Sequence, residues 1–140
     1  RHLSSAASDV YKRQDLETLL RPLVDAGVDV IHASNRRFWE PEFEGSNLNL
    51  AGWTKKITGL PTITVGSVGL ESDFIGFYQG EDEVKSAPID DLVKRMDGKE
   101  FDMVAVGRAL LSDPEWVNKV KEGRYDEVIP FSKKHAENYY

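Results

Sequence analysis

The chain contains no cysteine, and this absence removes several kinds of protein chemistry at once. Disulfide bonds, a thiolate nucleophile and a cysteine-ligated zinc site are all excluded. A chain without cysteine also suits a reducing compartment, so we expect a cytoplasmic protein. No apolar run approaches the roughly 20 residues that a membrane-spanning helix needs, and no signal-peptide core is visible. The sequence therefore predicts no association with a membrane.

The chain also lacks an excess of positive charge. Its 18 Lys and Arg residues are outnumbered by 24 Asp and Glu residues, which gives a formal net charge of −6. No basic stripe interrupts this acidity, so nucleic acid is not an expected partner. The three histidines have no partners at the spacing of metal ligands, and we predict no metal site.

The composition is that of a single α/β domain with a hydrophobic core, because 40% of the 140 residues are hydrophobic. Residues 1–14 show no sustained periodicity and resemble translated adaptor sequence, so we expect a non-native or disordered leader there. We expect a native domain over residues 15–131 and a tail over residues 132–140. The native protein would then begin near Asp15, with further sequence upstream.

Helical and strand patterns alternate along this domain. Helices are predicted over residues 49–57, 88–98 and 114–123, and from Asp15 to Gly27, where Pro22 would kink the helix or divide it in two. Strands are predicted over residues 28–34, 61–65 and 101–106. Such alternation predicts parallel strands joined by right-handed crossovers. A (β/α)₈ barrel needs eight strands and about 250 residues, so three strands can form only part of one.

Two of the predicted strands end in glycine turns. The buried-type run over residues 61–65 passes into Gly66–Gly69, and the run over residues 101–106 passes into Gly107 and Arg108. Glycine permits positive φ and close backbone approach, successive backbone N–H groups favour an anion, and arginine adds a fixed charge. The sequence therefore predicts one shared phosphate site, made by Gly66, Ser67, Val68, Gly69, Gly107 and Arg108.

Three longer stretches carry a family resemblance. Residues 45–53 (GSNLNLAGW), 61–69 (PTITVGSVG) and 101–117 (FDMVAVGRALLSDPEWV) resemble the C-terminal part of the old yellow enzymes, the FMN-dependent NAD(P)H oxidoreductases and ene-reductases. The resemblance implies that the predicted strands are the sixth to eighth of a TIM barrel, and that the two glycine turns hold the phosphate of FMN. It further implies NADH or NADPH as reductant and an enone-type small molecule as substrate.

The resemblance also indicates what this chain does not contain. The family's substrate-binding histidine pair and its proton-donating tyrosine lie upstream, so no catalytic residue is assigned here and the chain alone should be inactive. His32 is interpreted as a packed core histidine or as a polar group near the flavin. Phe38 and Trp39 could cover the core or line a substrate entrance, and Arg36 and Arg37 could be solvated or meet an NADPH phosphate.

Two other functions stay open on the residues alone. A phosphate-binding TIM-barrel lyase or isomerase would place a catalytic Lys or Glu inside a strand, and none of the three predicted strands has one. A non-enzymatic anion-binding α/β module would fold alone and bind no flavin. The long loops over residues 35–47 and 70–87 follow strands, where loops often carry function; the second could be a lid or a surface excursion. The oligomeric state is not predicted.

Overall fold

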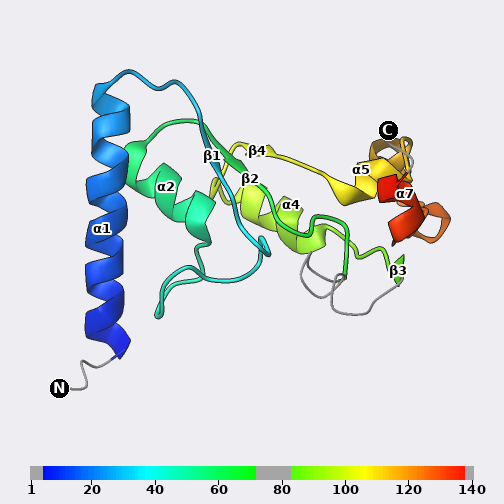
Figure 1. The fold of residues 1–140 in the computed structure, drawn as a ribbon, viewed down its shortest axis with the longest axis horizontal. Helices are drawn as coiled ribbons and strands as arrows, with labels where there is room; N and C mark the ends of the chain where they lie inside the picture. The colour runs from blue at the N-terminus through cyan, green and yellow to red at the C-terminus, as the bar shows by residue number, and fades with distance from the viewer. Residues whose placement is uncertain (1–4, 72–82, 138–140) are drawn as a thin grey trace.

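The computed structural model describes residues 5–71 and 83–137, with side chains from Lys12 onward, and its centre is a parallel β-sheet (Figure 1). The strands β1 (Ile31–Ala33), β2 (Thr62–Thr64) and β4 (Met103–Val104) lie in the order β1-β2-β4. Both pairings are parallel: His32 lies opposite Ile63, and Ile63 lies opposite Met103. The predicted α/β class, the three strands and their parallel direction are confirmed.

Two helices that connect these strands lie close to where the sequence predicts them. Helix α2 (Leu50–Thr58) begins after Asn49, whose side chain accepts a hydrogen bond from the backbone N–H of Gly52, and ends at Gly59 with φ 71°. Helix α4 (Asp90–Asp97) follows the short strand β3 (Glu83–Val84) and ends at Gly98. The prediction that Pro88 occupies the first helical position is wrong, because the helix begins two residues later.

The first helix is longer than predicted. Helix α1 runs without interruption over Ser5–Asp25, so Asp15 lies inside it and does not cap it. The residues before Asp15 include Ala, Lys, Arg and Gln, which are good helix formers, and nothing there stops the helix. Pro22 also lies inside this single helix, where it has no backbone N–H to donate a hydrogen bond. The origin of residues 1–14 is a separate question and stays an expectation.

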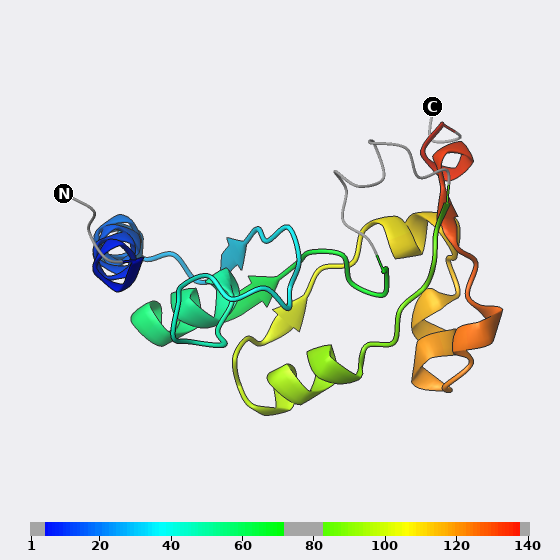
Figure 2. The same cartoon turned by 90° about the horizontal axis from the view of Figure 1, so that it is seen from below.

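The C-terminal part holds helix α6, which confirms the helix predicted over residues 114–123, together with elements that the sequence pattern does not predict. Helices α5 (Arg108–Ser112), α6 (Trp116–Lys121) and α7 (Lys133–Glu137), the 3₁₀ turn η1 (Tyr125–Glu127) and the strands β3 (Glu83–Val84) and β5 (Phe131–Ser132) gather at the end of the molecule opposite α1 (Figures 1 and 2). Strands β3 and β5 form a separate antiparallel ribbon. The predicted domain boundary after Phe131 therefore falls inside β5. The apolar pattern of the helix predicted over residues 114–123 would turn Val117 inward, but this side chain is 54% exposed.

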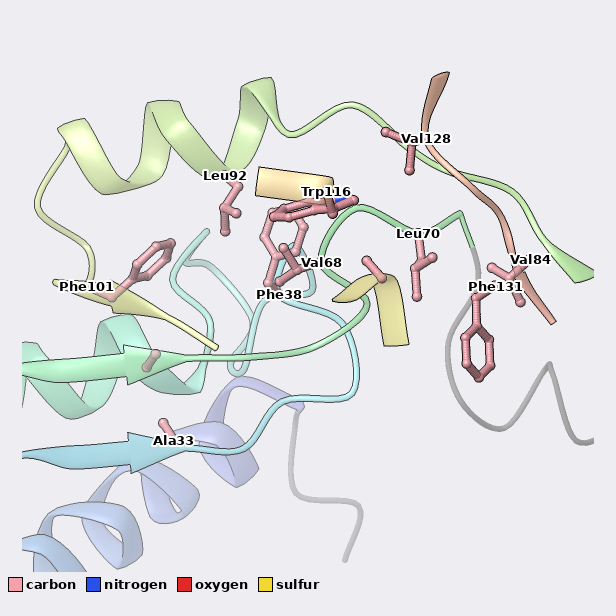
Figure 3. Close-up of a cluster of buried hydrophobic side chains, with 12 residues drawn as sticks. Ala33, Phe38, Val68, Leu70, Val84, Leu92, Phe101, Trp116, Val128 and Phe131 are labelled. Atoms are coloured by element: carbon pink, nitrogen blue, oxygen red, sulfur yellow. The ribbon is translucent and has the colours of Figure 1, made fainter. Parts of the chain in front are cut away.

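The hydrophobic core lies between α4, the turn after β2 and the C-terminal elements (Figure 3). Its largest members are aromatic: Phe101, Phe131 and Phe38, together with Trp116, are all at most 5% exposed. Trp116 lies directly against Gly69, where a β-carbon would be only 2.7 Å from the indole ring. Gly69 therefore serves packing, since it lets this tryptophan reach the turn after β2.

The two faces of the parallel sheet differ in how far their side chains are buried. Ala33 and Thr64 lie on one face and are buried beneath α2. Their neighbours on the other face, His32 and Met103, are exposed, and Ile63 between them is half-buried. Parallel sheets are normally covered on both faces, so this sheet has one face with no cover from the described residues. Within residues 5–71 and 83–137, no helix combines the length and apolar character that a membrane crossing requires.

One buried carboxylate joins the C-terminal elements. Asp113 is 1% exposed; its Oδ2 accepts from Lys119 Nζ at 2.7 Å and from the Ile129 N–H at 3.0 Å, and its Oδ1 accepts from the Glu115 N–H at 3.0 Å. Burial alone raises the pKa of Asp113, but these hydrogen bonds outweigh it and hold the pKa below its ordinary value. The side chain thus fixes the start of α6 to the segment that leads into β5.

Replacing this carboxylate should destabilise the fold. We expect Asp113→Asn to lower the free energy of unfolding by about 3 kcal/mol at pH 7, because Lys119 loses its buried partner. Because the folded-state pKa lies below the unfolded one, the stabilisation is present above about pH 4 and disappears as pH falls through the folded pKa. Urea unfolding at pH 7 and at about pH 3 measures the free energy of unfolding of this variant. Asp126→Asn, a substitution on the exposed η1 turn, is the control. Equal stability of the two variants at pH 7 would contradict it.

Candidate functional site

The candidate site lies where the three parallel strands end. Because β1, β2 and β4 run in the same direction, the segments that follow them meet at one edge of the sheet. A cavity of about 210 Å³ opens there. It is lined by residues from all three segments: Asn35, Arg36, Val65, Gly66, Ser67, Val68, Leu70, Ala105, Gly107 and Arg108.

The hydroxyl of Ser67 connects the three segments. It donates to the backbone oxygen of Arg36 at 3.2 Å, and it accepts a long hydrogen bond from Arg108 Nη2 at 3.4 Å. Ser67 adopts φ 51°, a left-handed conformation that non-glycine residues seldom occupy. An uncommon backbone conformation thus occurs at the residue that links the ends of β1, β2 and β4.

Gly66 allows the turn after β2 to touch the loop after β1. It has φ 132°, and a β-carbon on it would be 2.6 Å from the backbone oxygen of Asn35. The carbonyl of Gly66 also accepts from the Phe38 N–H at 3.1 Å. No other residue type fits this position without moving one of the two backbones.

The loop after β1 is held in place by buried polar groups. Asn49 is fully buried, and its Nδ2 donates to the Phe38 carbonyl at 2.8 Å and to Thr64 Oγ1 at 3.1 Å. Asn35 Nδ2 donates to the same hydroxyl at 3.1 Å. Arg95, from α4, donates from Nη1 to the backbone oxygen of Asn47 at 3.0 Å. Anchored at both ends, the loop presents Asn35 and Arg36 to the cavity in a defined position.

The charge of the cavity favours an anion. Two arginines, Arg36 and Arg108, line it, and no acidic side chain is among its described lining residues. The Arg108 guanidinium carbon lies 5.8 Å from the centre of the Phe131 ring, within cation–π range. Elsewhere in the described chain, no group of three or more Asp, Glu or His side chains lies close enough together to hold a metal ion.

Five of the six predicted site residues line this cavity. Gly66, Ser67, Val68, Gly107 and Arg108 are brought together from two strand ends, as the shared-site prediction requires. Gly69 is not among the lining residues and packs against Trp116. Whether the five bind a phosphate stays a prediction.

Sequence reasoning did not assign Asn35 or Arg36 to the phosphate site. Their position directly after a predicted strand was an available signal, because all carboxyl ends of a parallel sheet share one edge. Arg37, considered together with Arg36, instead forms an ion pair with Glu40. Phe38 is buried and Trp39 packs against the core, as one of their two interpretations predicts, and both side chains also line a cavity beside the turn after β2. His32, interpreted as a packed core histidine or a polar group near the flavin, is exposed on the uncovered sheet face in the described chain.

Comparison with known proteins finds a similarity to a curated protein. The chain is 35% identical over 118 residues to a curated protein named NADH oxidase from Thermoanaerobacter brockii, and the match covers 79% of this chain. The chain spans only 15% of that relative's length. No protein-family model matches the chain. The match therefore covers most of this chain but only a small part of a much longer relative.

The role of Gly66 can be tested against its counterpart on the neighbouring turn. We expect Gly66→Ala to lower the free energy of unfolding by about 3 kcal/mol, because the new methyl group meets the Asn35 carbonyl and the backbone is strained. Gly107→Ala should cost about 1 kcal/mol or less, since a β-carbon there has open space and φ is negative. Urea unfolding followed by circular dichroism gives both values. Equal losses in the two variants would show that close approach is not what Gly66 provides.

Proposed function

We propose that this chain supplies the phosphate end of an FMN site in an NAD(P)H-dependent oxidoreductase. The observation that carries the proposal is the convergence of Gly66, Ser67, Val68, Gly107 and two arginines on one cavity. Arginine offers phosphate a planar, permanently charged fork, and the glycine turns add backbone N–H donors. The donor set therefore fits a phosphate monoester.

The cavity is large enough to hold only part of a nucleotide. At about 210 Å³ it is smaller than the roughly 300–1,000 Å³ of sites that enclose whole drug-sized ligands. In this proposal Arg108 and Arg36 bind and orient the phosphate, Ser67 holds the Arg108 side chain at the cavity, and the ring system extends toward residues outside this chain. No residue of the chain is assigned a catalytic proton transfer.

The redox part of the proposal draws on the relative and on the motifs. The relative's printed name, NADH oxidase, describes an NADH-linked oxidoreductase. FMN, when bound, supplies hydride transfer between a nicotinamide and a second substrate. The resemblance of residues 45–53, 61–69 and 101–117 to old yellow enzymes supports a finer proposal, that this second substrate is an activated alkene such as an α,β-unsaturated carbonyl. As part of the same proposal we place the protein in the cytoplasm, which the lack of cysteine supports.

The uncovered face of the sheet supports a barrel as the complete architecture. In a TIM barrel one face of every strand lies under helices and the other contributes to a packed interior. Here His32, Ile63 and Met103 lie side by side on the uncovered face. We propose that β1, β2 and β4 are the last three strands of such a barrel. A sugar-phosphate lyase or isomerase on the same fold is less well supported, because β1, β2 and β4 contain no Lys or Glu.

The experiment compares FMN with riboflavin, which lacks only the phosphate. We expect the protein expressed from its complete reading frame to bind FMN more tightly than riboflavin. Arg108→Gln should weaken FMN binding about 10- to 100-fold, the effect of losing a charge-assisted hydrogen bond of about 1.5–3 kcal/mol. It should leave riboflavin binding unchanged. Quenching of flavin fluorescence measures both affinities.

The neighbouring Arg37→Gln serves as the control, because Arg37 pairs with Glu40 and does not line the cavity. It should retain the preference for FMN. Equal affinity of the wild-type protein for FMN and riboflavin would refute the phosphate site. An absence of flavin binding altogether would favour the non-enzymatic anion-binding module.

A further inference from the structure

The C-terminal strand β5 touches the arginine of the candidate phosphate site. Phe131, its first residue, is only 2% exposed, and its ring lies 5.8 Å from the Arg108 guanidinium carbon. Strand β5 also packs against α5, the helix that Arg108 begins. Arg108 therefore extends from Phe131 on one side to Ser67, its partner at 3.4 Å, on the other.

The same strand is connected to the other glycine turn through the β3–β5 ribbon. Phe131 pairs with Val84 of β3, as Figure 3 shows for the two side chains. Beyond β3 the chain returns to the turn after β2: Ser86 forms a bridge with Leu70, and the Ala87 N–H donates to the Gly69 carbonyl at 2.9 Å. The ribbon thus contacts Arg108 through Phe131, and the segment that directly follows β3 contacts the turn after β2.

We propose that Phe131 is a positioning residue for phosphate binding, and that the β3–β5 ribbon sets the spacing between the two glycine turns. This inference rests on the proposed function. An arginine side chain loses much rotamer freedom when it binds a ligand, and holding it beforehand reduces that cost. The buried ring of Phe131 holds the guanidinium through its π face and directs it toward Ser67 and the cavity.

The test is a double-mutant cycle on Phe131 and Arg108 in the protein from the complete reading frame. We expect Phe131→Leu, which stays apolar but loses the ring, to weaken FMN binding about two- to fivefold and to leave riboflavin binding unchanged. In the Arg108→Gln background the same substitution should have no further effect on FMN, because the group that Phe131 positions is absent. Val128→Ala, which truncates another buried residue of the same core, is the control for general destabilisation and should keep the FMN-to-riboflavin ratio.

A second readout does not depend on FMN. Phenylglyoxal modifies arginine side chains, and mass spectrometry reports the rate at each one. Phe131→Leu should increase the rate at Arg108 and leave Arg95, which is held on α4 by Asp91 and Glu100, unchanged. An unchanged rate at Arg108 would overturn the positioning role.

The outcomes separate this inference from the proposed function. If wild-type protein shows no preference for FMN over riboflavin, the proposed function fails, and the Arg108 labelling rate still decides whether Phe131 orders the guanidinium. If the preference exists but Phe131→Leu weakens FMN and riboflavin equally, or weakens FMN as much in the Arg108→Gln background, the positioning role is refuted while the phosphate site stands.

Discussion

The parallel register of β1, β2 and β4 is the constraint on which the candidate site depends. Because His32, Ile63 and Met103 lie in one row across the sheet, the residues that follow each strand come to the same edge. Ser67 then connects what the register has brought together, through its bonds to the Arg36 carbonyl and to Arg108. Without that register, the two arginines would lie at the ends of unrelated segments, and neither glycine turn would form a cavity alone.

The two glycines of the first turn show why a motif must be weighed against packing. Gly66 is required by the approach of the Asn35 carbonyl, and Gly69 by the indole of Trp116. Both requirements exist without a ligand, so a Gly-x-x-Gly sequence after a strand does not by itself indicate phosphate. What packing does not explain is the presence of both Arg36 and Arg108 on the wall of one cavity. The positive charge and the position of these two side chains are therefore what favour an anion.

The sequence predicts those parts of the fold that a local pattern determines. The β-branched run that forms β2, the Asn49 cap of α2 and the glycine that ends it are each readable within a few residues. The β3–β5 ribbon is not, because strands of two residues are too short for periodicity and depend on the pairing of Val84 with Phe131, with 46 residues of chain between them. The exposure of His32 was also unpredictable, since it depends on what covers the far face of the sheet, which no local pattern records.

The overall charge of the chain limits how the site could attract its ligand. With a net charge of −6, this chain produces a long-range electrostatic field that opposes an approaching anion. Salt screens that field beyond about 8–10 Å. Attraction must therefore come from groups within a few ångströms, which are Arg36, Arg108 and the donors of the glycine turns. Short-range recognition of this kind depends on how well each donor is oriented. An acidic chain therefore depends more than a basic one on contacts that hold an arginine in place. In our proposal the contact between Arg108 and the buried ring of Phe131 is such a contact.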